Sequence, residues 1–273
     1  MIHTFKRFFC STALVIAVAS VNGYTGEPVT EGTPVQDAEE GGNLFTYGFE
    51  LDGVSAYLWH GLEQSNGAVM QPWLWGSILD FTVSVWGNYS FVMSDGLDNP
   101  SLYGDRIDDF ELLIDYENSF ADFTFAPTLQ FYFLPEDDIT GEITLKVSHP
   151  LWFVDLYTSH TFDIIGYLGA YFGDIGLAFE KELPAGITIS ASTALGWASA
   201  AFNGANIDSS VEKWALNLFS ADVNVTWYAL PFLYIYPHCT FAAILDKDLQ
   251  DALEAQDMNA VNFAGGLAVG VEF

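Results

Sequence analysis

The sequence ends with FAGGLAVGVEF, residues 263–273, and this stretch alternates between two kinds of side chain. Apart from Gly265, the odd-numbered positions are large and apolar, whereas the even-numbered positions from Ala264 to Glu272 are small or polar. This period of two is typical of a strand with lipid on one face and a confined interior on the other. Because a terminal strand exposes a raw edge unless another strand covers it, we expect it to pair with the first strand. The stretch predicts the closing strand of a transmembrane β-barrel; the alternative is the last strand of a soluble sandwich.

The composition favours a protein of the membrane interface. Of the side chains, 51% are hydrophobic and 16% are aromatic, and acids outnumber bases 36 to 7. Acidic chains that remain disordered are poor in aromatic residues, so this chain is not of that class. The shortage of bases also argues against nucleic-acid binding, because no basic surface would meet the phosphates.

The N-terminal region reads as a targeting segment. Lys6 and Arg7 precede a short apolar core, Phe8 to Ala19, and small residues follow. This order predicts a cleaved signal peptide over residues 1–23, followed by an acidic flexible leader over residues 24–43. No later run of about twenty apolar residues could form a transmembrane helix. An exported chain of this kind can cross a membrane only as a barrel, which we assign to residues 44–273.

The rest of the chain divides into twelve strand-like segments. In the first, the alternation changes phase near Gly53, which predicts a bulge. Helical spacing occurs only around residues 248–257. The segments cover residues 45–60, 69–79, 81–91, 109–117, 122–133, 140–149, 151–162, 167–183, 187–197, 213–228, 232–245 and 261–273.

The connections between these segments alternate in length. Every second connection is tight, with the sixth placed at Pro150, and three of the others are long and polar. Outer-membrane barrels have short periplasmic turns and longer outer loops, and an even strand count puts both termini on the short-turn side. A soluble sandwich has no reason to sort its loops in this way. The prediction is an all-β, antiparallel, up-and-down transmembrane barrel of about 12 strands.

The end of the first segment carries a motif of the form S-x-Y-x-aromatic-x-G-x-x-Q, formed here by Ser55, Tyr57, Trp59, Gly61 and Gln64. It resembles the opening hairpin of the TorF-like family of bacterial outer-membrane porins. His60 replaces the arginine usual in that family, and Ala56 replaces a frequent acid, which removes a charge pair. The resemblance covers about twenty residues and implies a transport role without a defined substrate or catalytic residue. The terminal Phe273 also resembles the signal by which the barrel assembly machinery recognises the last strand.

If the apolar face meets outer-membrane lipid, the opposite face lines the lumen. Acids dominate that face, and such a surface favours cations. The sequence therefore predicts passive passage of small cationic or neutral solutes. Two alternatives stay open: a plugged interior, because Trp86 and Tyr132 also face inward, and a non-conducting barrel that binds or anchors through its outer loops. The predicted lumen residues are Glu50, Asp52, Asp109, Glu111, Asp115, Glu142, Lys146, Asp174, Glu180, Asp222 and Glu272, with Glu117 and Asp122 on the same face.

The sequence predicts no catalytic, metal or cofactor site. The pairs Ser148-His149 and Ser159-His160 are adjacent on strands, so their side chains point to opposite faces and cannot form a nucleophile–base pair. The remaining histidines are too scattered for a metal site. Tryptophans near segment ends fit an interfacial girdle instead, namely Trp73, Trp75, Trp152, Trp197, Trp214 and Trp227.

Overall fold

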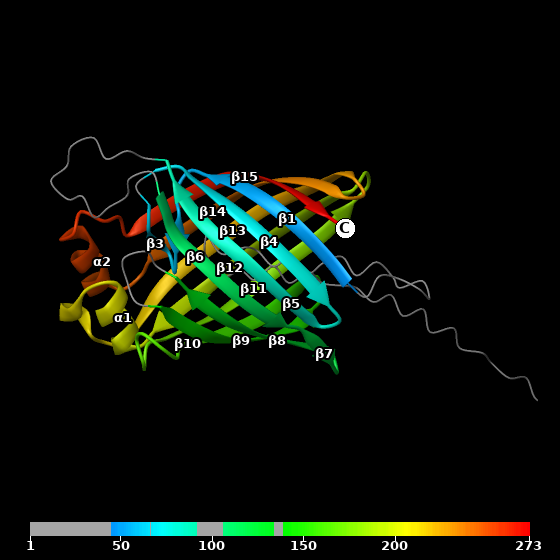
Figure 1. Cartoon of the computed structure of the whole chain (residues 1–273). Coiled ribbons are helices and arrows are strands. Elements are labelled where there is room, and N and C mark those ends of the chain that lie inside the picture. Colours follow the sequence, from blue (N-terminus) through cyan, green and yellow to red (C-terminus); the bar gives the residue numbers. More distant parts are fainter. Residues whose placement is uncertain (1–44, 66, 92–105, 134–138) are drawn as a thin grey trace, which may run out of the picture.

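The computed structural model of the chain describes residues 45–65, 67–91, 106–133 and 139–273. The predicted signal peptide and acidic leader lie outside the described residues. Inside them, a single antiparallel sheet curls into a closed barrel (Figure 1). No helix of the described chain is both long and apolar enough to cross a bilayer.

Twelve strands in register form the barrel wall. β6 and β7 both pair with β8 and are separated by Glu117 alone, so together they make one wall strand. The predicted strand number and antiparallel order are confirmed. The wall consists of β1 (Phe45–Val54), β4 (Val69–Ile78), β5 (Phe81–Ser90), β6 (Arg106–Tyr116), β7 (Asn118–Phe120), β8 (Phe123–Tyr132), β9 (Thr140–Leu151), β10 (Val154–Asp163), β11 (Tyr171–Leu183), β12 (Ile187–Ala198), β13 (Ala215–Leu230), β14 (Leu233–Ile244) and β15 (Val261–Glu272).

The first and last strands close the ring, as predicted. β1 and β15 pair from Gly48 opposite Glu272 to Val54 opposite Gly266. Beyond β15, the Phe273 and Tyr47 backbones exchange hydrogen bonds of 2.9 and 3.1 Å. Every wall strand therefore has two neighbours, and no raw edge remains in the wall.

The two ends of the barrel differ. Tight connections lie at the end that holds the start of β1 and the end of β15, whereas α1 (Ala200–Asn206), the 3-10 turn η1 (Ser209–Val211) and α2 (Lys247–Glu254) lie at the opposite end (Figure 1). We call these the short-turn end and the outer end. The sixth connection falls at Trp152–Phe153, not at Pro150, because β9 continues through Leu151.

The first strand is shorter than predicted. β1 ends at Val54, and its register is unbroken against both β4 and β15, so there is no bulge at Gly53. The alternation changes phase because the chain leaves the wall there. It forms an inner hairpin from β2 (Leu58–Trp59) and β3 (Leu62–Glu63). His60 and Gly61 form its two-residue turn with φ of 48° and 78°, the left-handed backbone that such a turn requires.

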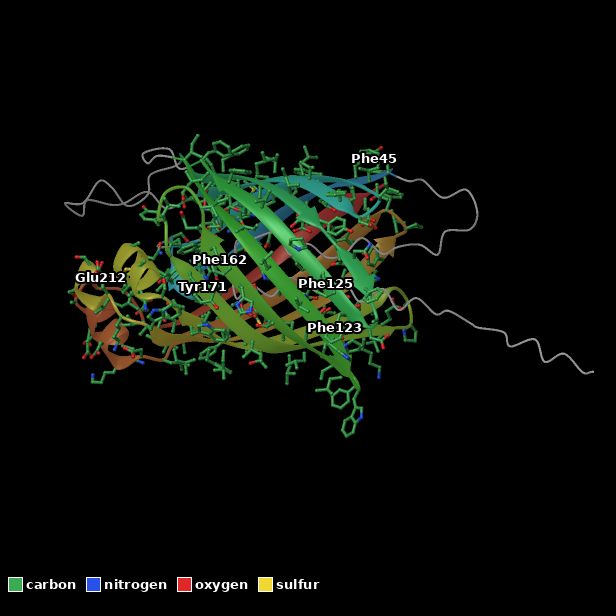
Figure 2. All side chains as sticks on the ribbon, turned by 90° about the horizontal axis from the view of Figure 1, so that it is seen from below. Phe45, Phe123, Phe125, Phe162, Tyr171 and Glu212 are labelled. Carbon is green, nitrogen blue, oxygen red and sulfur yellow. The ribbon has the colours of Figure 1, made fainter. Side chains whose placement is uncertain are left out.

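Large apolar side chains cover the outside of the wall, the arrangement expected of a lipid-facing belt. Aromatic rings gather near both ends, with Phe45 and Phe123 near the short-turn end and Phe162 and Tyr171 near the outer end (Figure 2). Phe273 joins the short-turn group, where its ring stacks on Phe232 at a centroid distance of 5.9 Å.

Two of the tryptophans assigned to the girdle lie elsewhere. Trp73 and Trp75 are central in β4, and their side chains are buried inside the barrel at 4% and 6% exposure. The alternation of β4 runs Val69, Gln71, Trp73, Trp75 toward the inside, so the girdle assignment is wrong for this pair.

Candidate functional site

The inner wall carries the predicted acids. Register and burial place all eleven predicted lumen residues, Lys146 included, on the inner face. Glu117 and Asp122 are different: both are exposed at the short-turn rim, and Asp122 lies in the turn itself with φ of 66°. The alternation places Glu117 on the same face as Asp115, at the rim of the lumen, whereas Asp122 lies in the turn beyond the strand end. Sequence reasoning also missed Asp155 and Asp163, which alternate inward with Tyr157 on β10.

Hydroxyl and amide groups hold the inner carboxylates against the wall. The Tyr132 hydroxyl donates to Glu142 at 2.8 Å, and the Gln130 amide donates to Glu111 at 2.6 Å. Thr240 likewise donates to Asp222 at 2.5 Å. Hydrogen bonds to a carboxylate are among the stronger ones in proteins, so these side chains have fixed positions.

A second group of contacts crosses the closing strand. Tyr234 and Tyr236 on β14 donate to Glu50 on β1 at 2.8 and 2.7 Å. One step further out, His238 Nε2 lies 2.8 Å from Asp52 Oδ2. We call these three contacts the seam contacts, because they join β14 to β1 across β15.

The small inner residues of β15 make the seam contacts sterically feasible. Between Asn262 and Glu272, this face of the strand consists of Ala264, Gly266, Ala268 and Gly270. A Cβ atom at Gly270 would collide with the Tyr234 ring, and one at Gly266 would collide with the His238 ring. The rings therefore lie flat over β15 instead of projecting across the lumen. The pattern that predicted a strand also provides the space for its neighbours' side chains.

Lys146 is the one lysine or arginine on the inner wall among the side chains that the structure describes. Its Nζ lies 4.8 Å from the centroid of the Tyr157 ring. Lys181 faces outward, and Lys213 and Lys247 belong to the outer end. The acidic character predicted for the inner wall thus holds for its described side chains.

The outer end of the interior is filled by an apolar core, which sequence reasoning did not foresee. We call the hairpin segment, residues 55–65, together with the side chains packed around it, the plug. Its buried members come from strands on opposite sides of the barrel, such as Trp86 on β5 and Leu218 on β13. The helices contribute Phe202 from α1 and, from α2, Leu249 and Leu253, which have no exposed surface.

The hairpin turn reaches the far wall. The His60 ring lies 4.2 Å from the Phe172 ring and 4.9 Å from the Phe202 ring, centroid to centroid. Asn262 on β15 donates to the Gly61 carbonyl at 2.9 Å, and a Cβ at Gly61 would meet Leu218 at 2.5 Å. Burial lowers the pKa of the His60 imidazole well below its ordinary value, so the ring is neutral at pH 7.

The residues of the S-x-Y-x-aromatic-x-G-x-x-Q motif build this plug. The Gly265 amide donates to the Ser55 hydroxyl at 3.0 Å, where the chain leaves the wall. The Tyr57 hydroxyl donates to Asp109 at 3.2 Å, and the backbone N–H of Gln64 donates to the Tyr57 carbonyl at 2.8 Å. Trp59 stacks on Phe202 at 5.7 Å. His60 and Ala56 suit this apolar setting, because a buried ion pair at these positions would cost desolvation energy.

The outer cap carries its own charged contact. The amine of Lys213 lies 2.8 Å from Asp246, the residue that caps the N-terminus of α2, and 2.5 Å from Asp248. The hydrogen bond with Asp246 raises the pKa of the exposed Lys213 amine. This contact fixes α2, the helix predicted near residues 248–257, above the plug. Within the described ranges, no group of three or more His, Cys, Asp or Glu side chains is arranged to hold a metal ion.

His160 lies on the lipid face of the wall and has a hydrogen-bond partner on the neighbouring strand. The Tyr171 hydroxyl lies 2.9 Å from His160 Nδ1 and accepts from the Trp197 indole at 3.1 Å. Both partners are outward residues of neighbouring strands near the outer end. His160 therefore faces outward, and the cluster belongs to the aromatic belt.

The fold is similar to that of solved barrel structures. A structure of the NanC porin matches with a TM-score of 0.52 and 11% identity over 82% of this chain and 98% of that chain. An outer-membrane channel from Pseudomonas putida F1 has a TM-score of 0.48 at 11% identity, over 84% of this chain and 94% of that one. The KdgM porin has a TM-score of 0.46 at 8% identity, over 84% and 98%. At these identities the likeness shows the fold alone.

No protein-family model matches the sequence. No curated protein matches it either.

Proposed function

We propose that the protein is a porin-like channel of the bacterial outer membrane for passive diffusion of small cationic or neutral solutes, closed at its outer end in this conformation. The acid-dominated inner wall carries this proposal, because fixed carboxylates raise the local concentration of cations and oppose anions. The motif around Tyr57 supports a place in the TorF-like family. In this proposal the chain is exported with a cleaved signal peptide, and the barrel assembly machinery inserts it through the strand that ends at Phe273.

Conduction requires the plug to move. Inner residues toward the short-turn end, such as Glu180, Asp222 and Glu272, are partly exposed, whereas the plug side chains Leu58 and Leu62 are almost fully buried. A solute that enters from the short-turn end meets polar wall first and apolar packing last. The proposed open state differs from this structure by displacement of the hairpin and leaves the wall unchanged.

Planar-bilayer recording tests the proposal. We expect rare single-channel steps from the wild type and frequent steps from Leu62→Ser, which weakens the plug. Leu168→Ser is the matched control, because Leu168 is 75% exposed in an outer loop and contributes nothing to the plug. In a salt gradient, the reversal potential should indicate cation preference. Anion preference would overturn the proposed selectivity.

A non-conducting barrel that anchors or binds through its outer loops is the second candidate, and the plug is the observation that favours it. The same recordings separate the two functions. If neither the wild type nor Leu62→Ser shows steps while both give heat-modifiable bands on gels, the channel function is wrong and the non-conducting barrel stands.

A further inference from the structure

Lys146 lies in a niche formed by three adjacent strands of the inner wall. Ser159 on β10 pairs with Lys146 on β9 at one side and with Asp174 on β11 at the other. Since neighbouring strands are about 4.8 Å apart, the Lys146 and Asp174 backbones are separated by about 10 Å. The small Ser159 between them leaves space into which a long side chain can lean. All three are buried, at 7%, 2% and 5% exposure.

Tyr157 provides an aromatic face for this niche. Its ring lies against Gly176, where a Cβ atom would collide with it, so the ring is held flat on the wall. The Lys146 amine is 4.8 Å from the ring centroid, within the roughly 6 Å range of a cation–π contact. Tyr157 is 1% exposed, which fixes the position of the ring.

Asp174 provides the negative charge. Its Oδ1 atom is buried and has no hydrogen-bond partner among the described residues. A buried carboxylate oxygen in that state is costly unless a cation is near. The Lys146 charge interacts favourably with this carboxylate. The niche thus combines a ring face with an open acceptor, which is the chemistry that recognises an ammonium group.

We propose that this niche is a binding site for primary ammonium groups and that Lys146 is its tethered occupant. Removing the Lys146 side chain should leave a vacancy that a short alkylammonium ion fills.

The test is rescue of Lys146→Ala by n-propylammonium chloride, read as the midpoint temperature at which the heat-modifiable gel band converts. We expect Lys146→Ala to have a lower midpoint than the wild type. Added amine should raise it saturably, by about 5–10 °C at roughly 100 times its dissociation constant. Sodium chloride at equal ionic strength and the bulkier tetramethylammonium ion should not raise it. If Lys146→Ala folds only with help, refolding in propylammonium against sodium gives the same readout.

Three variants make the test specific. Lys146→Met fills the niche with an apolar chain and should not respond to the amine. The double variants Lys146→Ala/Asp174→Asn and Lys146→Ala/Tyr157→Leu should lose the rescue, since each lacks one part of the site. Absence of rescue in Lys146→Ala, or equal rescue in the double variants, overturns the site. The measurement is made in detergent and does not depend on conduction. A barrel that is rescued by the amine but never conducts would therefore contradict the channel function and support the ammonium site.

Discussion

The two ends of the barrel interior are built on opposite principles. At the outer end, Leu58, Leu62 and Phe202 exclude water and leave almost no exposed surface. Toward the short-turn end, the wall presents Thr, Ser and acidic side chains, held by hydrogen bonds and partly exposed. The first arrangement resembles the core of a soluble domain, and the second resembles a hydrated surface folded inward. The difference shows that one wall supports both a seal and a polar lumen, depending on what the connecting loops place inside it.

The largest expected effect separates the plug from the wall. Leu62→Ala removes buried methyl groups, which typically costs about 2–5 kcal/mol in a packed core. We expect this cost to fall on the plug, so that the open probability in bilayer recordings rises about tenfold for each 1.4 kcal/mol lost. The heat-modifiable band should persist, because the wall strands do not depend on the hairpin for their pairing. Loss of that band would mean that plug and wall fold as one unit.

The next largest effect is expected from a change at the seam contacts in the barrel wall. Gly270→Ala places a Cβ against the Tyr234 ring, and overpacking of this kind costs about 1–3 kcal/mol. The midpoint temperature of band conversion should fall while the open probability stays that of the wild type. Gly265→Ala on the same strand is the matched control, because its Cβ would have only ordinary contacts, at 3.6 Å and beyond. An equal fall in both variants would show that strand propensity, not ring packing, is responsible.

The plug should also weaken at acidic pH. Burial depresses the pKa of His60 in the folded plug, because the packed plug favours the neutral imidazole. The free energy that holds the plug closed is therefore at its full value above the ordinary histidine pKa of about 6.5, and it declines as the pH falls below that value. Each further pH unit should cost the plug about 1.4 kcal/mol and raise the open probability about tenfold.

The control for the pH effect is His60→Asn. Asparagine tolerates the left-handed backbone of this turn but does not titrate. The difference between the two proteins isolates the imidazole from the carboxylates, which titrate in both. An identical pH response of the wild type and His60→Asn would rule out this role for His60.

The smallest expected effect concerns charge in the polar part of the lumen. Removing one partly exposed carboxylate with Glu180→Gln should lower the ratio of cation to anion permeability by about twofold, since a unit charge several ångströms from an ion in water contributes about 0.5 kcal/mol. The reversal potential in a salt gradient measures this ratio. Glu182→Gln changes an exposed acid at the rim, two residues further along the chain, and provides the comparison. A larger change from Glu182 would place the selective region at the rim.

The wall could be predicted because lipid enforces alternation. Wherever apolar groups face out and polar groups face in, as in β15, each residue type indicates its side of the sheet. That signal also located the inward position of Glu50, whereas the pairing of β1 with β15 followed from the need to cover the edge of the terminal strand. It weakened in β4, where Trp73 and Trp75 face an apolar interior, because large apolar side chains then occur on both faces.

The plug could not be predicted by the same reasoning. From Ser55 onward, the residues are as suitable for a strand as those before them. The change of phase near Gly53 fits a bulge in a continuous strand as well as a chain that leaves the wall. The helix α1 contains Gly204 and has only Phe202 and Asn203 buried, so its seven residues show no clear helical period. α2 was predictable because Leu249 and Leu253 are four positions apart behind an Asp246 cap.

The seam contacts have a consequence for the lifetime of the folded barrel. Tyr234 and Tyr236 reach Glu50 only after β15 lies between them, so these hydrogen bonds form once the ring has closed. Interactions absent from the transition state for closure slow unfolding without speeding assembly. The small residues of the last strand should therefore slow the unfolding of the barrel without changing its rate of insertion. The slow step is the separation of the first and last strands of the chain.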